Sequence, residues 1–214
     1  MQSFSAYTSH EIEILAPLGG PAFGERVVKA IRTADAAAYN GSSALFEDVG
    51  SCDVVGDIRR AKINEAIGGV ATAMGLSCHF EKPERQRYHT PVITADGTVL
   101  TVARMYGHNR VSRPSGLRCD LAQMRFELFD GMGDMTSAPN DNVRVLILAY
   151  EVGIAGDSPI VTDIELQEVG TSPELVTYRM NLAAKVESRS VADHEVVYDD
   201  FDIKPKERLL RKHA

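Results

Sequence analysis

The strongest apolar pattern in the chain is the run from Val143 to Val152, which reads V-R-V-L-I-L-A-Y-E-V. Both its odd and its even positions are mostly apolar, and valine, isoleucine and tyrosine favour extended backbone. A polar segment precedes the run and Gly153 follows it. A short apolar run with these boundaries predicts a central β-strand that is covered on both faces.

Three segments have apolar residues at helical spacing. The first runs from Pro21 to Tyr39, where Asn40-Gly41 is expected to end it, and the second runs from Asp57 to Met74. The third begins near Leu117, and residues 42–52 are expected to form a connector with at most one helical turn. The predicted seams consist of Val27, Ile31, Ala34 and Ala38, then Ile63, Ile67, Val70 and Met74, then Leu117, Leu121, Met124 and Leu128.

Further strands are predicted from alternation and from turn residues. They are residues 11–15, residues 76–80, a hairpin of 91–94 and 98–106 joined through Ala95-Asp96-Gly97, and residues 160–169. In 160–169, Ile160, Ile164 and Leu166 alternate with Val161, Asp163, Glu165 and Gln167, which predicts one buried and one wet face. This strand is expected to pair antiparallel with 143–152 near the edge of the sheet.

The resulting order, α-α-β-β-β-α-β-β, predicts an α+β fold in which helices pack on a mixed or antiparallel sheet. Residues 172–187 fit either a helix or a strand. We expect a single domain over 1–190 and a polar, peripheral tail over 191–214. The order of elements from Asp57 to Val169 resembles the core of restriction-endonuclease-like proteins, an analogy that rests on element order alone.

That resemblance implies a metal-dependent site with an acid on one hairpin strand and an acid-x-Lys motif on the next. Asp96 instead falls in the turn, and the second strand, T-V-L-T-V-A-R-M-Y, contains no acid. Asp163 and Glu165 could bind a cation on a later strand, or they could form a solvated strand face. The usual active site of that family is therefore missing from the sequence.

Metal, cofactor and hydrolase motifs are also missing. Cys78-His79, His89, His108 and Cys119 lack the paired spacing of zinc ligands, and Gly19-Gly20 does not begin a phosphate-binding loop. We predict no cofactor and no metal. No apolar run is long enough to span a bilayer, and the first residues lack the features of a secretory signal. The odd number of cysteines, three, favours free thiols in a reducing bacterial-type cytoplasm.

Charge is unevenly distributed along a chain whose net charge is −7. Residues 79–125 hold eight Lys or Arg and four acids, so this window is basic. Two loops joined by the hairpin carry most of these cations, and Tyr88 and Tyr106 could stack on a ligand. The predicted nucleic-acid-binding or anion-binding residues are Lys82, Arg85, Arg87, Tyr88, His89, Arg104, His108, Arg110, Arg113 and Arg118, which Arg59, Arg60 and Lys62 could extend.

These patterns favour a binding or regulatory accessory protein that contacts a protein partner or a nucleic acid through the basic patch, without contact with a membrane. A solvated surface is the plainest alternative for a run of charges. A second alternative is a metal-dependent, nuclease-like hydrolase with a non-standard site that uses Asp96, Asp163 or Glu165. A third is a self-assembling subunit, a homo-oligomer in which the basic centre of one copy meets the acidic C-terminal half of another.

Overall fold

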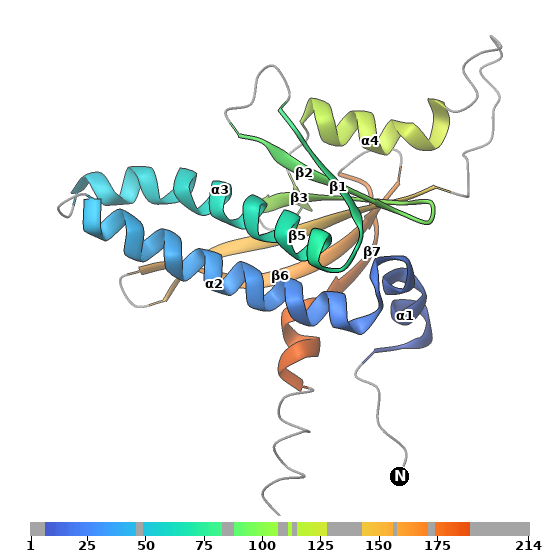
Figure 1. The fold of residues 1–214 in the computed structure, drawn as a ribbon, viewed down its shortest axis with the longest axis horizontal. Helices are drawn as coiled ribbons and strands as arrows, with labels where there is room; N and C mark the ends of the chain where they lie inside the picture. Colours follow the sequence, from blue (N-terminus) through green and yellow to red (C-terminus); the bar gives the residue numbers. More distant parts are fainter. Residues whose placement is uncertain are drawn as a thin grey trace, which may run out of the picture.

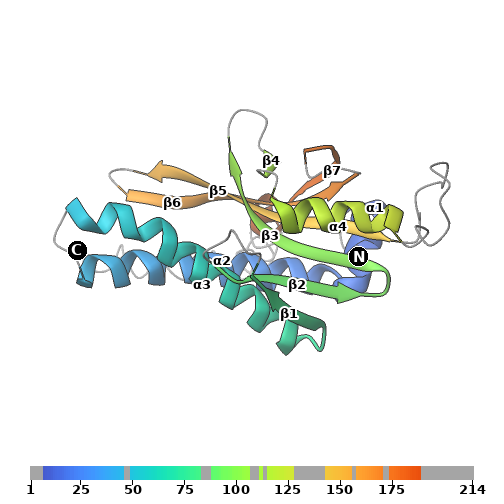
Figure 2. The ribbon, with the colours of Figure 1, turned by 90° about the horizontal axis from the view of Figure 1, so that it is seen from above.

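A mixed β-sheet carries the fold, with a pair of long helices on one face and a shorter helix on the other (Figure 1 and Figure 2). The computed structural model describes residues 7–45, 49–82, 88–106, 111–112, 115–127, 143–155, 158–170 and 174–188. The helices are α1 (Ser9–Leu15), the 3-10 turn η1 (Ala16–Leu18), α2 (Pro21–Leu45), α3 (Val49–Ala73) and α4 (Gly116–Glu127). The strands are β1 (Ser77–Glu81), β2 (Thr90–Ala95), β3 (Thr98–Tyr106), β4 (Val111–Ser112), β5 (Arg144–Ala155), β6 (Ser158–Val169) and β7 (Val176–Asn181).

The strands follow the order β1-β2-β3-β5-β6-β7, and the short β4 pairs with β3. The β3–β5 pair is parallel, with register from Thr98↔Arg144 to Arg104↔Tyr150, and every other neighbouring pair is antiparallel. A parallel pair needs a crossover connection, and α4 lies in that connection. The predicted α+β class with a mixed sheet is therefore confirmed.

Strand β5 lies inside the sheet, as its pattern predicts. Its even positions, including Leu146 and Leu148, join the core beneath α2 and α3. Its odd positions, including Val145 and Ile147, join a second core beneath α4. All four side chains are at most 1% exposed, so the prediction of a doubly covered strand is confirmed.

The β2–β3 hairpin forms at the predicted turn. Both Asp96 (φ 41°) and Gly97 (φ 72°) have left-handed backbone, the conformation that a two-residue type I′ turn requires. Aspartate and glycine adopt this conformation at lower cost than most residues, which is why the Asp-Gly pair identified the turn.

The strand predicted at residues 11–15 is wrong, because this segment is the helix α1. Thr8 caps it: the Thr8 hydroxyl accepts a hydrogen bond from the Glu11 amide at 3.3 Å, and the Glu11 carboxylate accepts one from the Thr8 amide at 2.6 Å. This reciprocal capping box satisfies backbone donors that would otherwise be unpaired. The T-x-x-E spacing was visible in the sequence and outweighs the alternation of E-I-E-I-L.

The Glu11 carboxylate also ties α1 to the C-terminal end of the described chain. It accepts a hydrogen bond from Lys185 Nζ at 2.8 Å, in a helical segment at 182–188 that follows β7. Burial of Glu11 opposes ionisation, but the hydrogen bonds from Lys185 and Thr8 outweigh it and lower the pKa of Glu11 below its ordinary value of 4.5. Residues 172–187, left open by the sequence, thus supply both a strand and a helix within their described part.

Helices α2 and α3 are longer than predicted. Asn40-Gly41 does not end α2, which continues to Leu45, and α3 begins at Val49 within the expected connector. An interior glycine costs a helix about 1 kcal/mol, which is too little to end a helix that packs along a neighbour. The predicted seams of both helices are correct, since Val27, Ile31, Ile63 and Ile67 are fully buried.

The predicted wet face of β6 is wrong. Glu165 is 5% exposed and Gln167 is fully buried, on the face of the sheet against which α4 packs. The Gln167 amide donates to Glu165 Oε2 at 2.9 Å and lies 3.5 Å from the Met105 sulfur. These hydrogen bonds let polar side chains occupy a buried face, which alternation alone cannot reveal.

A β-bulge between β5 and β6 then changes which positions are buried. Glu151 pairs with Asp163 and Val152 pairs with Val161, so Thr162 is the additional residue. Val161 therefore faces the core beneath α2 and α3, while Ile160 is 38% exposed.

Among the described residues, no helix is long and apolar enough to cross a membrane.

Candidate functional site

Helix α3 presents three faces to different surroundings. Ile63, Ile67 and Ala71 are fully buried against the sheet. A second face contacts the connection between β1 and β2, and a third faces α2 and solvent. Because residues three or four apart share one face of a helix, each face can be examined separately.

The second face holds the end of the β1–β2 connection against α3. Asn64, 5% exposed, donates a hydrogen bond from Nδ2 to the His89 carbonyl oxygen at 2.7 Å. One turn earlier, the Arg60 guanidinium lies 5.7 Å from the centre of the Tyr88 ring, within the range of a cation–π contact. Arg60, Tyr88 and His89 are therefore neighbours, as the predicted extension of the basic patch requires. The extension is wrong for Arg59, which is buried in an ion pair with Asp35, and Lys62 lies on another face of α3.

The hairpin places the described residues that flank the two predicted basic loops at one end of the sheet. Val92 pairs with Thr101, so the start of β2 lies beside the end of β3, and β1 ends opposite Thr90. Lys82 is exposed just beyond β1. The predicted residues Arg85, Arg87, His108, Arg110 and Arg113 lie outside the described residues, so their assembly into a patch stays a prediction.

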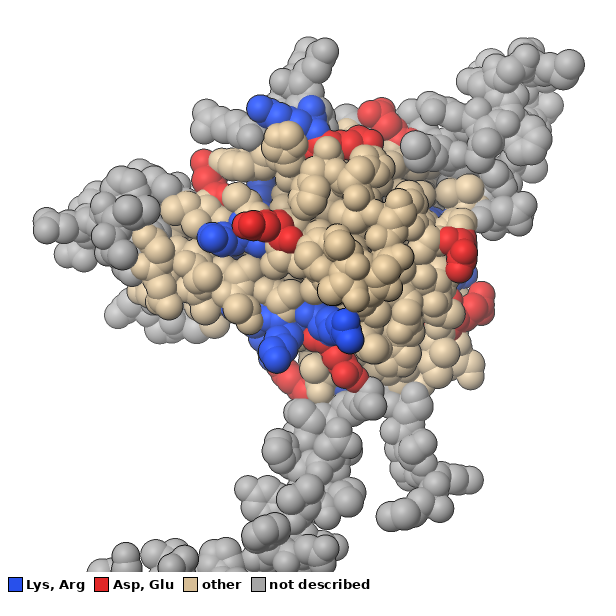
Figure 3. Space-filling model, in the orientation of Figure 1, with Lys and Arg blue, Asp and Glu red and all other residues tan. Residues whose placement is uncertain are grey.

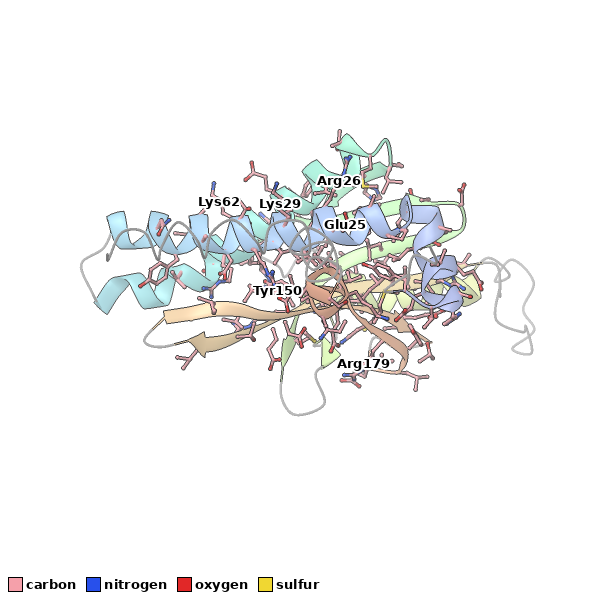
Figure 4. The ribbon with its side chains drawn as sticks, turned by 90° about the horizontal axis from the view of Figure 1, so that it is seen from below. Glu25, Arg26, Lys29, Lys62, Tyr150 and Arg179 are labelled. Carbon is pink, nitrogen blue, oxygen red and sulfur yellow. The ribbon has the colours of Figure 1, made fainter. Side chains whose placement is uncertain are left out.

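Arg104 and Arg118, also predicted as site residues, lie on opposite faces of the sheet. Arg104 is on the same face of β3 as Leu100 and Val102, the face beneath α2 and α3. It pairs in register with Tyr150, which Figure 4 shows between the helices and the sheet. Arg118 is in α4 and is 7% exposed, beside Leu117. The structure therefore does not bring these two arginines together.

The third face of α3 and the facing side of α2 form an apolar groove of about 550 Å³. The lining is made of small side chains, mostly alanine. The lining residues other than the charged ones are Ala30, Thr33, Ala34, Ala37, Ala66, Gly69, Val70 and Ala73. Its volume lies within the roughly 300–1,000 Å³ of typical ligand pockets. Alanine and glycine permit a ligand to approach both helix backbones closely.

The rim of the groove is basic. Arg26 and Lys29 from α2 and Lys62 from α3 lie around it, with Glu65 as the only carboxylate in the lining. Figure 4 shows the three cations on the side of the helix pair away from the sheet. Figure 3 shows a largely uncharged surface with separate Lys and Arg side chains around it, some of them beside Asp or Glu. The rim therefore carries a net charge of +2 in a chain whose net charge is −7.

These three cations differ from many other basic side chains of the described residues. None of the three forms an ion pair with a described carboxylate. In contrast, five Lys or Arg side chains lie within 4.0 Å of a described carboxylate: Arg32, Arg59, Arg144, Arg179 and Lys185. The unpaired rim can thus attract an external anion without first breaking an internal ion pair.

The sequence predicted only half of this surface. The seam through Val27 and Ile31 indicated the buried side of α2, whereas the groove uses the neighbouring stripe at 30, 33 and 37. The signal that could have revealed it is the alanine-rich segment A-D-A-A-A at 34–38, which is apolar over more of the helix circumference than a core contact needs.

The acids of the hydrolase alternative take part in structural contacts. Asp163 Oδ1 accepts hydrogen bonds from the Ile164 amide and from Asn181 Nδ2, both at 2.8 Å, and Glu165 accepts one from Gln167. Asp96 precedes the Thr98↔Arg144 pair, and Asp163 lies opposite Glu151, seven residues further along β5. At about 3.3 Å per residue, Asp96 and Asp163 are more than about 20 Å apart, so these two acids do not form one site.

The candidate metal ligands Cys78, His79 and Cys119 do not form one site either. Cys78 and His79 lie on β1, where His79 Nε2 is 3.0 Å from Glu81 Oε1, and Cys119 lies on α4 at the other face of the sheet. Over the described ranges, no group of three or more His, Cys, Asp or Glu is placed to hold a metal ion. Burial raises the pKa of the Cys78 thiol, which disfavours a reactive thiolate there.

Comparisons with known proteins give no match to a family model, to a curated protein or to a solved structure. The resemblance to restriction-endonuclease-like proteins therefore stays an analogy of element order, and the function has to be proposed from the site itself.

Proposed function

We propose that this chain is a non-catalytic binding protein that contacts an acidic partner protein through the groove between α2 and α3. The observation that carries the proposal is the combination of an apolar lining with a basic rim at Arg26, Lys29 and Lys62, none of which forms an ion pair within the described residues. An amphipathic helix or strand with apolar and acidic residues would fill such a groove and neutralise its rim.

The composition of the lining favours a protein segment over a nucleic acid. Nucleic-acid surfaces combine closely spaced cations with aromatic rings on which bases stack. The groove lining contains no aromatic residue and consists mostly of alanine, glycine and valine. These side chains match the apolar face of a peptide, for which burial of surface supplies the affinity.

The contact between Arg60 and Tyr88 favours a second candidate, a nucleic-acid surface at the end of the hairpin. The Tyr88 ring and the exposed His89 could stack on bases, while Lys82 and the predicted loop arginines contact phosphates. This surface adjoins the second face of α3 and is separate from the groove, so the two candidates can be tested independently.

We further propose a cytoplasmic location. The Cys78 and Cys119 thiols are free, as expected for a chain in a reducing compartment.

The test uses the full-length chain and two fluorescent probes. One is a synthetic amphipathic peptide of leucine and glutamate, and the other is an oligonucleotide, single-stranded or double-stranded; binding is followed by fluorescence anisotropy. We expect saturable peptide binding whose affinity Lys62→Glu lowers by about 1.5-fold to fivefold, the range for one exposed ion pair.

Lys82→Glu is the matched control, because it makes the same charge change on an exposed lysine outside the groove. It should leave peptide affinity unchanged. Salt-sensitive oligonucleotide binding that Lys82→Glu weakens would support the second candidate. Equal losses of peptide affinity in both variants would contradict the groove proposal.

A further inference from the structure

We infer that, in the free protein, the groove between α2 and α3 is occupied by residues 191–203 of the same chain. This inference rests on the proposed function, since it names a competitor for the same groove. An external partner would then have to displace this segment, which makes the site self-regulated.

The sequence of the segment has the composition that the groove requires. Residues 191–203 read V-A-D-H-E-V-V-Y-D-D-F-D-I, with five acids and no lysine or arginine. Their apolar side chains include Val196, Val197, Tyr198 and Phe201. A segment with a charge of −5 and several large apolar side chains thus complements a rim of +2 around an apolar groove.

The segment can reach the groove from where the described chain ends. The last described helical residues, 182–188, lie against α2, because Glu187 forms an ion pair with Arg32. The groove begins on the adjacent side of α2, at Lys29 and Thr33. A helix with its side chains is about 10–12 Å wide, and an extended residue spans about 3.3–3.6 Å. About four residues beyond Ser188 are therefore enough to cross α2, which leaves the later part of the segment, with Val196, Val197, Tyr198 and Phe201, to lie in the groove.

Tethering favours this occupant over a free competitor with the same chemistry. A short linker holds a segment at an effective concentration on the order of millimolar. Weak contacts, such as exposed ion pairs and a few buried apolar side chains, can then keep the groove filled. A partner protein must offer a more acidic or more apolar segment, or must be abundant, to take its place.

The chain contains no tryptophan, which permits a direct test in the full-length protein. Phe201→Trp places a single indole in the segment, and its emission maximum and acrylamide quenching report burial. We expect blue-shifted emission and slow quenching. Adding Lys62→Glu should lower the ratio of docked to free segment by about 1.5-fold to fivefold, while adding Lys82→Glu should not change it.

A compensating variant separates docking from misfolding. Asp199→Lys with Asp200→Lys, in the Phe201→Trp background, should expose the indole without changing the circular dichroism spectrum. Adding Lys29→Glu and Lys62→Glu to this variant should restore the blue shift. Emission of a solvent-exposed indole that none of these changes alters would overturn the inference. So would a blue shift that grows with protein concentration, since the occupant would then be a second copy.

The same variants distinguish failure of this inference from failure of the proposed function. If the indole introduced by Phe201→Trp is exposed in every variant but the leucine–glutamate peptide still binds, only the intramolecular occupant is refuted. If the peptide fails to bind even to the variant with Asp199→Lys and Asp200→Lys, the groove is not a binding site and both proposals are refuted.

Discussion

The buried ion pair between Asp35 and Arg59 connects both long helices to the bulged end of β6. Asp35 Oδ1 accepts a hydrogen bond from Arg59 Nε at 2.5 Å, and Asp35 Oδ2 accepts one from the Val161 amide at 2.6 Å. Arg59 also donates from Nη2 to the Pro159 carbonyl oxygen. The two ionic side chains are 10% and 3% exposed, so removal of either leaves a buried charge without its counterion.

We predict that Asp35→Ala lowers the free energy of unfolding by about 3–5 kcal/mol, the cost of breaking a buried pair. For a chain of this length, that corresponds to a fall in Tm of roughly 6–20 °C. Adding Arg59→Met removes the stranded guanidinium, and the only further group that this second change leaves without its partner is the Pro159 carbonyl, at about 1–3 kcal/mol. The double variant should therefore be more stable than Asp35→Ala alone.

Urea unfolding followed by circular dichroism measures all four members of this double-mutant cycle. The sign of the second step is decisive. If Arg59→Met destabilises the Asp35→Ala protein further, the stranded charge is not the origin of the cost. A loss below about 1 kcal/mol for Asp35→Ala would contradict the burial itself, because that is the value of an exposed pair.

Three other sets of substitutions test separate parts of the fold by the same unfolding measurement. Glu11→Gln should destabilise the protein at neutral pH, and progressively less as the pH falls below 4.5. The reason is that the lowered pKa of Glu11 in the folded state contributes stability that is lost on acidification. An equal effect at every pH would contradict this. Gly97→Ala should lower the free energy of unfolding by about 1 kcal/mol, because Gly97 has φ 72°. Gly69→Ala, in open space on the helix α3, should raise it by about 0.5–1 kcal/mol. A change of the same sign in both variants would contradict the left-handed backbone at Gly97 or the helical backbone at Gly69. Gly153→Ala would bring a Cβ to 2.7 Å from Thr162 Cγ2 and should cost about 1–3 kcal/mol, most of which Thr162→Ala should recover.

The sequence was most informative where one physical factor dominates. The apolar run of β5 requires cover on both faces, and Asp96-Gly97 requires a turn with left-handed backbone; both predictions are confirmed. Helix ends were predicted less well, since packing of α2 against α3 offsets the cost of Gly41. The burial of Glu165 and Gln167 could not be foreseen, because it depends on the packing of α4 on that face of the sheet and on the contact of Gln167 with Met105 of β3.

The groove shows what a search for charged and catalytic residues overlooks. The predicted site was chosen for its cations, so Lys62 was identified from its charge but the alanine-lined surface beside it was not. That surface depends on α2 and α3 lying side by side, which periodicity in each helix does not determine. Five of the predicted site residues lie outside the described ranges, and the remaining five are divided between the two faces of the sheet and its end.

The most direct test of the groove as a binding surface is NMR of the full-length chain labelled with ¹³C at the alanine methyl groups. The leucine–glutamate peptide is titrated into the variant with Asp199→Lys and Asp200→Lys, in which the groove is expected to be free. We predict chemical-shift changes at Ala30, Ala37 and Ala73, which line the groove, and none at the sheet residues Ala103 and Ala149. Changes confined to residues outside the groove, or none at any alanine, would contradict the account.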